Sequence, residues 1–240
     1  MYPYFNLFGV NISSYAIMAA IGIVISIAVL ILNCKRFHAD FDDSIYIYAF
    51  SLIGIFLGAR ILFVIIEIPS RGLSFETIFG GGFVFWGGFI GGWLAAVIAA
   101  NYFRVNIKDM YTVLVPSMII FAGFGRIGCF LVGCCYGRES ELFGMCYSIS
   151  EIAPNGCPLF PVQLLEALFD FTVAFLLTGK KDSMFKYTLS YSIFRFFAEF
   201  LRGDEVRGFV GRLSVSQFIS IVVFGVVLAS CLRNVRRMPV

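Results

Sequence analysis

Long apolar stretches, separated by short polar segments, dominate the pattern of residues along the chain. A helix needs roughly 20 consecutive, mostly apolar residues to cross the hydrocarbon core of a bilayer. Seven stretches reach or approach that length: Ser13 to Asn33, Ile45 to Ile66, Gly82 to Ala100, Tyr111 to Cys134, Pro161 to Thr178, Tyr187 to Leu201, and Leu213 to Cys231. The pattern predicts an all-α fold, a polytopic membrane bundle of about seven transmembrane helices.

The composition narrows the class of protein further. Of the 240 residues, 60% are hydrophobic and only 14% are charged, whereas a soluble domain has about 45–50% apolar and about 25% charged residues. These proportions exclude a soluble enzyme, a secreted disulfide scaffold, a disordered chain and a nucleic-acid binder. The formal net charge of +3 is too small to indicate a partner by itself.

The loops predict the orientation and the domain organisation. Ten of the 18 basic residues fall in loops on one side, five fall on the other, and Arg60, Arg126 and Arg195 lie inside predicted helices. The positive-inside rule then places the C-terminus in the cytoplasm and the N-terminus outside. No basic residue precedes the first stretch, so we expect no cleavable signal peptide there. The longest loop, Arg138 to Phe160, is too short for a core of its own, and we expect a single integral membrane domain over 1–240.

Ionisable residues inside the predicted helices are the first candidates for function. Each costs about 2.5–3.5 kcal/mol in the hydrocarbon region and therefore needs a partner or a role. Arg195, Glu199 and Arg202 are spaced by four and then three residues, which places them on one helix face. Arg60 and Arg126 add charges from two other stretches.

A further predicted helix carries polar residues on one face. Gln163, Glu166 and Asp170 follow one another at intervals of three and four residues. Charges from four helices are therefore expected to meet in a polar interior near the outer membrane surface. Guanidinium groups match phosphate oxygens in charge and geometry, which favours a phospholipid headgroup as ligand. The alternative is a set of ion pairs that only hold the bundle together.

A glycine-rich block, GGGFVFWGGFIGGW, begins at Gly80. Its glycines 87 and 91, and 88 and 92, form two overlapping GxxxG pairs, a pattern typical of close helix packing. The first three glycines could instead form a tight turn whose amides face a headgroup.

Several motifs, taken in order, resemble the prolipoprotein diacylglyceryl transferases of bacterial inner membranes. GRIGCFLVGCCYGR is similar to the family signature built on Gly-Arg-Ile-Gly-Asn-Phe, and FPVQLLEA is similar to its Pro-Thr-Gln-Leu-Tyr-Glu-Ala segment. The matching segments are GARILFV at 58–64, GGFVFWGGFIGG at 81–92, the signature at 125–138, FPVQLLEA at 160–167, YSIFRFFAEFLRGD at 191–204 and LSVSQFISI at 213–221.

The resemblance implies an activity and a location. The family transfers a diacylglyceryl group from phosphatidylglycerol to the lipobox cysteine thiol of a preprolipoprotein and releases glycerol phosphate. It implies a multi-pass protein of the bacterial cytoplasmic membrane whose partners are an anionic phospholipid and a lipobox peptide, with no cofactor and no nucleic acid.

The resemblance also assigns site residues by position. The catalytic set is Arg126, Arg195, Glu199 and Tyr15, in which the arginines hold the phosphate and Glu199 orients Arg195. The substrate-binding set is Arg60, Arg202, Gly137, Gly87, Gly88, Gln163 and Glu166.

Three positions depart from the family pattern. Trp86 replaces the family histidine, Cys129 replaces the asparagine of the signature, and Cys134 replaces an acidic residue. A general base assigned to that histidine cannot operate here, so the arginine field activates the acceptor thiol or the chain uses another acceptor. A third hypothesis is a non-catalytic phospholipid-binding or transport protein.

The single histidine, His38, is expected to be solvated in an inner loop.

The seven cysteines, at 34, 129, 134, 135, 146, 157 and 231, exclude a fully paired disulfide framework because their number is odd. The CxxxxCC spacing on one helix cannot gather four ligands, so no metal site is predicted. Cys129, Cys134 and Cys135 are packing thiols or have a covalent or redox role, and a pair between Cys146 and Cys157 stays open.

Overall fold

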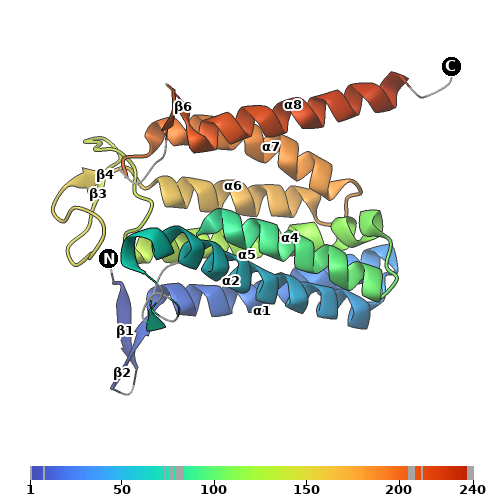
Figure 1. The fold of residues 1–240 in the computed structure, drawn as a ribbon, viewed down its shortest axis with the longest axis horizontal. Coiled ribbons are helices and arrows are strands. Elements are labelled where there is room, and N and C mark those ends of the chain that lie inside the picture. Colours follow the sequence, from blue (N-terminus) through green and yellow to red (C-terminus); the bar gives the residue numbers. More distant parts are fainter. Residues whose placement is uncertain are drawn as a thin grey trace. The chain divides into compact units, whose positions relative to one another are not determined.

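The computed structural model describes residues 2–7, 9–72, 74, 75, 78, 80, 84–204, 209–211 and 213–236. Its main elements are helices, which confirms the predicted all-α class (Figure 1). They are α1 (Ser14–Phe37), α2 (Phe41–Arg71), α4 (Phe85–Tyr102), α5 (Ile107–Val132), α6 (Val162–Leu177), α7 (Ser183–Ala198), the 3₁₀ turn η1 (Glu199–Leu201) and α8 (Val215–Arg236).

Each predicted apolar stretch coincides with one of these helices. Three of the described helices are long and apolar enough to cross a membrane: Ser14–Phe37, Phe41–Pro69 and Ile107–Val132. Two shorter apolar helices cover Gly87–Tyr102 and Val215–Ser230. The number of crossings and the sides of the two termini stay predictions.

Short antiparallel strand pairs complete the described fold. They are β1 (Tyr4–Leu7) with β2 (Val10–Ser13), β3 (Met145–Cys146) with β4 (Pro158–Leu159), and β5 (Phe209–Val210) with β6 (Leu213–Ser214). The chain divides into two compact units, Leu30–Leu114 and the remainder, Met1–Val29 with Val115–Val240. The single-domain prediction is not tested by this division.

In the unit Leu30–Leu114, glycines bring α2 and α4 into backbone contact. A Cβ atom built on Gly54 would lie 2.6 Å from the Cβ of Ala95 and closer still to the carbonyl oxygen of Gly91. Gly87 and Gly58 face each other in the same way. This contact supports the packing role of the GxxxG pairs; two of the first three glycines of the block, at 81 and 82, lie outside the described residues.

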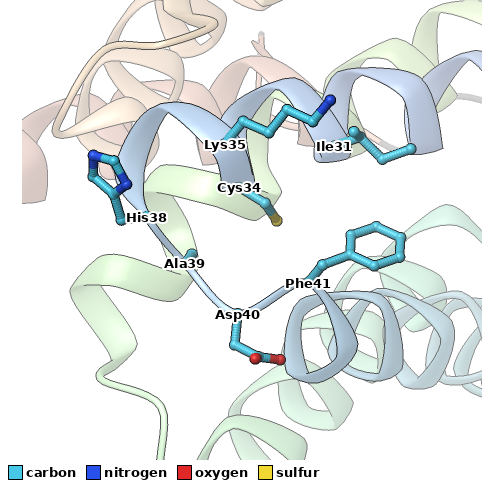
Figure 2. A pocket seen from close by; sticks show the side chains of 7 residues that line it. All are labelled: Ile31, Cys34, Lys35, His38, Ala39, Asp40 and Phe41. Carbon is cyan, nitrogen blue, oxygen red and sulfur yellow. The ribbon is translucent and has the colours of Figure 1, made fainter.

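The turn between α1 and α2 belongs to the same unit. The side chain of Asp40 accepts a hydrogen bond of 2.9 Å from the backbone N–H of Asp43 and caps α2. A shallow pocket of about 690 Å³ at this turn is lined by residues that include Cys34, Lys35 and His38 (Figure 2). His38 is exposed, in agreement with the solvated position expected for it.

In the other unit, aromatic contacts join α5 to α6 and α6 to α7. The ring of Phe171 packs against Gly123 and meets Phe124 edge-on at 5.1 Å, while Phe169 and Phe194 stack at 4.0 Å. These contacts set the neighbouring helices at fixed rotations about their axes.

The loop between α5 and α6 has more structure than its length predicts. Tyr147, Ala153 and Leu159 form a buried cluster, against which Tyr136 and Cys157 pack. The loop therefore has a small buried cluster, which does not test the single-domain prediction. Apolar side chains from both ends of the loop reach one another because β3 pairs with β4.

Replacing Gly54 with Ala tests the backbone contact between α2 and α4. The added methyl group forces the helices apart, and we expect Gly54→Ala to lower the stability by about 1–3 kcal/mol. Thermal unfolding in detergent, followed by circular dichroism, measures the change. Gly225→Ala is the control, because a Cβ atom on Gly225 in α8 meets nothing within 4 Å. An equal unfolding temperature for both variants would contradict the close contact.

Candidate active site around Glu166

The site is organised around Glu166, which α6 places between two arginines. Its Oε2 lies 3.2 Å from Nε of Arg126 on α5, and its Oε1 accepts a short hydrogen bond from Arg195 on α7. Only 3% of the Glu166 side chain is exposed, compared with 16% for Arg126 and 11% for Arg195. One buried carboxylate thus holds two guanidinium groups from two other helices.

Arg195 has two further partners. It pairs with Oε2 of Glu199 at 2.8 Å, four residues later in the chain, and donates to the hydroxyl oxygen of Ser216 at 3.3 Å. Ser216 lies on α8, so the network joins α5, α6, α7 and α8. Glu199 thus pairs with Arg195, while the catalytic roles assigned to both residues stay predictions.

Arg202 forms a separate ion pair at the end of η1. Its Nε and one terminal nitrogen donate to the two carboxylate oxygens of Asp204 at 2.9 and 2.5 Å. Burial opposes the charge, but the ion pair with Asp204 outweighs it and raises the pKa of Arg202 above its usual value. Arg202 therefore stays charged at any physiological pH.

Gly137 fixes the position of Arg202. The two residues form an antiparallel bridge, and the backbone N–H of Arg138 donates to the carbonyl of Leu201 at 2.8 Å. A Cβ atom on Gly137 would lie 2.9 Å from that same carbonyl oxygen and closer to the one of Phe160. Any larger residue at position 137 would push the end of the signature segment, residues 125–138, away from the backbone around Arg202.

Gln163 ties α6 to the loop after α5. Its Nε2 donates to the backbone carbonyl of Cys134 at 2.8 Å and to the hydroxyl of Tyr147 at 3.2 Å. Burial raises the pKa of Tyr147 to about 12, so its phenol stays protonated. Among the described residues, the Oε1 atom of Gln163 is buried with no hydrogen-bond partner.

Tyr15 lies against the face of α5 that carries the arginine. A Cβ atom on Gly128 would lie 2.9 Å from the Tyr15 ring, and one on Gly125 would lie 3.7 Å from its hydroxyl. The small residues at these two positions let the exposed Tyr15 ring lie along the segment of α5 that contains Arg126.

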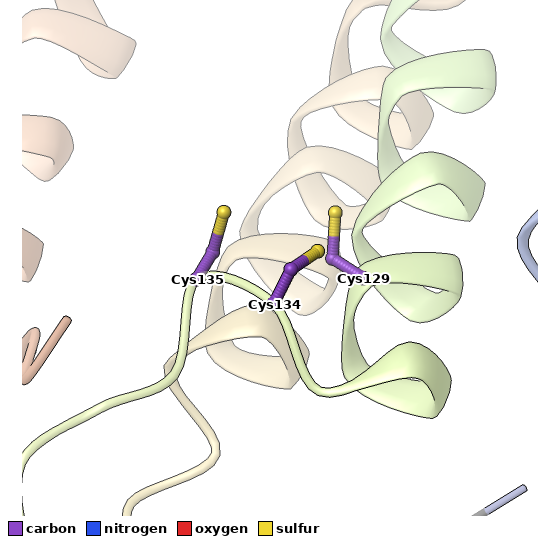
Figure 3. A group of neighbouring side chains, drawn as sticks. All are labelled: Cys129, Cys134 and Cys135. Carbon is purple, nitrogen blue, oxygen red and sulfur yellow. The ribbon is translucent and has the colours of Figure 1, made fainter. Parts of the chain in front are cut away.

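Three thiols converge at the end of α5. The sulfur atoms of Cys129, Cys134 and Cys135 all lie within 4.8 Å of one another and are partly exposed (Figure 3). Hydrogen bonds from the Cys129 and Cys134 thiols, and the charges of Arg202 and Arg126, lower the pKa of Cys135, although burial opposes them. Cys146 and Cys157 are free thiols in the same loop.

The remaining predicted site residues belong to the unit Leu30–Leu114. Arg60 lies on α2, donates from Nε to the carbonyl of Ile78 at 2.9 Å and lies 5.2 Å from the ring of Phe63. Gly87 and Gly88 pack against α2. Trp86 is in α4, and its side chain lies outside the described part of the chain. The substrate-binding assignments of Arg60, Gly87 and Gly88 stay predictions.

Comparison with known proteins identifies the family. The family model for prolipoprotein diacylglyceryl transferase matches residues 3–233. The chain belongs to this family. The chain is similar to the phosphatidylglycerol–prolipoprotein diacylglyceryl transferase 2 of Clostridium perfringens, with 36% identity over 91% of this chain and 89% of that protein. It is also similar to the phosphatidylglycerol–prolipoprotein diacylglyceryl transferases of Clostridium tetani, with 35% identity over 97% and 96%, and of Clostridioides difficile, with 30% over 94% and 92%.

Membership makes this protein a transferase. Three residues that contact the predicted site residues in the structure were not singled out from the sequence. Asp204 was not singled out as the partner of Arg202, although its position two residues later is a readable signal. Ser216 and Tyr147 reach the site only through the packing of α8 and of the loop, so no local pattern marks them.

Replacing Glu166 with Gln tests whether its carboxylate stabilises the two buried arginines of the site. The substitution leaves two buried guanidinium groups without their shared counter-charge, which costs about 3–5 kcal/mol. We expect a much lower unfolding temperature in detergent. The matched control is Glu151→Gln, an exposed glutamate in the loop before α6. A Glu166→Gln protein as stable as the control would show that the arginines do not depend on this carboxylate.

Proposed function

We propose that the protein transfers a diacylglyceryl group from phosphatidylglycerol to the cysteine thiol of a prolipoprotein lipobox. The reaction takes place at the outer face of the bacterial cytoplasmic membrane. The observation that carries the proposal is the buried network of Arg126, Glu166, Arg195 and Glu199, which holds two guanidinium groups from α5 and α7 around one carboxylate. The names of the relatives give the donor and the acceptor.

The arginines bind the donor and stabilise the leaving group. A guanidinium group has five N–H donors, so a carboxylate that engages one edge does not exhaust it. Arg126 is the most exposed of the three arginines in the site, at 16% of its side chain, and is the one best placed to meet a headgroup. Negative charge on the phosphate grows as the bond from the glycerol carbon to oxygen breaks, and fixed positive charges lower that barrier.

Other residues orient these groups. Glu166 and Glu199 fix the guanidinium of Arg195, and Asp204 fixes that of Arg202. The hydroxyl of Tyr15 and the Oε1 atom of Gln163 are candidates for hydrogen bonds to the donor. Tyr15 packs against Gly125 and Gly128, on either side of Arg126 in the chain, and the Gln163 oxygen is buried without a described partner.

The protein crosses the membrane about seven times, with the N-terminus outside and the C-terminus in the cytoplasm, and forms one membrane domain. Two basic residues in the last turn of α1, Lys35 and Arg36, support a cytoplasmic position for the turn that follows this helix. The same orientation puts the loop after α5, and with it Gly137 and Arg202, on the outer side, where lipobox cysteines are modified.

A second candidate keeps the phospholipid donor and changes the acceptor. The replacement of three family positions by Trp86, Cys129 and Cys134 favours it, because two of these residues lie in the thiol cluster beside the site. In this case the protein turns over phosphatidylglycerol in vitro and fails to restore growth in a strain depleted of its lipoprotein transferase. Restored growth would instead assign the lipobox acceptor.

Substituting Arg126 tests the proposed reaction. We expect Arg126→Ala to reduce the rate of diacylglyceryl transfer to a lipobox peptide by about 100- to 1000-fold, and Arg126→Lys to recover part of it. Mass spectrometry detects the thioether-linked peptide, and an enzymatic assay measures glycerol phosphate. Lys108→Ala removes an exposed cation at the start of the same helix and leaves the rate unchanged.

The same assay separates the proposal from its alternatives. Activity that survives both Arg126→Ala and Arg195→Ala would overturn the site assignment. Phospholipid binding that depends on both arginines, without any product, would instead indicate a lipid-binding or transport protein.

A further inference from the structure

The three-thiol cluster defined by Cys129, Cys134 and Cys135 has no role in the donor site described above. Two features set it apart from cysteines that only fill space. Its sulfur atoms lie within 4.8 Å of one another, and all three residues are partly exposed. A packing role requires an apolar surrounding and gives no reason for three sulfurs to meet.

The local fold gathers the sulfurs. Helix α5 ends at Val132, and Gly133 turns the chain back with a φ of 89°. The backbone N–H groups of Gly133 and Cys134 both donate to the carbonyl of Cys129, at 2.9 and 3.0 Å. The turn therefore brings Cys134 back beside Cys129, and a CxxxxCC segment that could not converge on a continuous helix converges at its end.

Cys135 is held in a costly backbone conformation. Its φ is 58°, in the left-handed region that residues with a side chain seldom adopt. Such conformations persist where the surroundings enforce them, and they concentrate at functional sites. The hydrogen bond from Gln163 to the carbonyl of Cys134 holds the preceding peptide group in place.

We propose that Cys129, Cys134 and Cys135 bind a zinc ion through their three sulfurs, with a fourth position open to the thiol of the acceptor. Zinc-to-sulfur bonds are about 2.3 Å long, so three sulfurs around one ion lie about 3.8–4.0 Å apart, a spacing that the described positions reach with small side-chain movements. Thiolates select soft ions such as zinc, and three protein ligands with an open position are the pattern of catalytic rather than structural zinc sites.

The charges around the cluster agree with this occupant. Three thiolates and one Zn²⁺ ion carry a net charge of −1, and Arg126 lies three residues before Cys129 on α5, where its positive charge opposes that of the cluster. A zinc ion also supplies what the chain otherwise lacks, a way to activate an acceptor thiol where Trp86 replaces the family histidine, because a thiol bound to the ion loses its proton.

The role of the zinc ion in diacylglyceryl transfer rests on the proposed function, whereas the existence of the zinc site does not. The acceptor thiol binds zinc at the open position and releases its proton to water. The sulfur then attacks the glycerol carbon of the donor, so a carbon–sulfur bond forms while the bond between that carbon and the phosphate oxygen breaks. The electron pair stays on the phosphate, which leaves as glycerol phosphate. Zinc keeps its oxidation state, and the resulting thioether, a weak ligand, dissociates.

Zinc content tests the site directly. The full chain, purified in detergent, is dialysed against a weak chelator, and zinc is measured by mass spectrometry. We expect about one zinc ion per chain, and a loss to the background level in Cys129→Ser, Cys134→Ser and Cys135→Ser. Cys146→Ser, which removes an exposed thiol of the same loop, retains the metal. Unfolding temperatures and phosphatidylglycerol binding show that each variant is folded.

Three results would overturn the site. They are wild-type protein with no more zinc than the three serine variants, folded serine variants that retain zinc, and a disulfide between two of the three cysteines in freshly isolated protein.

Activity then tests the role in transfer. Removing zinc is expected to slow transfer to the lipobox peptide by about 100-fold, and adding Zn²⁺ to restore it, while phosphatidylglycerol binding is unchanged. Full activity of zinc-free protein would overturn this role and leave the proposed function standing. If no form of the protein makes product, the proposed function fails, and the zinc content alone decides the site.

Discussion

The contact of Glu166 with two arginines is the interaction on which the rest of the site depends. A lone guanidinium in the hydrocarbon region costs about 2.5–3.5 kcal/mol, so α5 and α7 tolerate Arg126 and Arg195 only where a counter-charge meets them. Glu166 supplies it from the helix between them in the chain, at 3.2 Å from Arg126. The carboxylate joins three helices and at the same time points two arginines toward one place. Stability and the proposed phosphate binding therefore depend on one set of charges, and a substitution that breaks the ion pairs is expected to affect both.

Close contacts between backbone segments fix the position of Arg202, which the ion pairs alone do not determine. Gly137 is where the loop after α5 meets Phe160, two residues before α6, and the segment after η1. Its N–H donates to the carbonyl of Phe160 at 3.1 Å. Gly203 packs against the backbone of Gly137, because a Cβ atom on Gly203 would lie 2.5 Å from the Gly137 carbonyl oxygen. Side chains are excluded on both sides, so the position of Arg202 is set by the main chain. Asp204 then sets the plane of its guanidinium through two hydrogen bonds. Backbone spacing and bidentate pairing together leave Arg202 little freedom.

The sequence predicts the part of the site that follows helical spacing. Residues four apart on a helix meet, so Arg195 and Glu199 could be paired in advance, and the structure joins them at 2.8 Å. Apolar length likewise predicted where helices lie. Contacts between residues far apart in the sequence could not be predicted from helical spacing, because they depend on the conformation of the turns and loops between them. Gln163 donates to the carbonyl of Cys134, 29 residues earlier, through a loop whose small core of Tyr147, Ala153 and Leu159 has no periodic signature. The convergence of three sulfurs was missed for the same reason, since a continuous helix was assumed where Gly133 turns the chain.

In the proposed reaction, Cys129 on α5 links the donor site to the thiol cluster, whose other members, Cys134 and Cys135, follow the end of that helix. Arg126 and Cys129 are three residues apart on one helix, so they share a face and lie about one turn from each other. In the proposed reaction, a phosphate bound at Arg126 would therefore lie close to a sulfur held at the cluster, at the end of the helix that opens to the outer side in the predicted topology. Displacement at carbon requires the entering sulfur and the leaving oxygen on opposite sides of that carbon. A rigid helix that holds both binding groups keeps the reactants at a constant separation, which replaces the entropy cost of bringing a lipid and a peptide together.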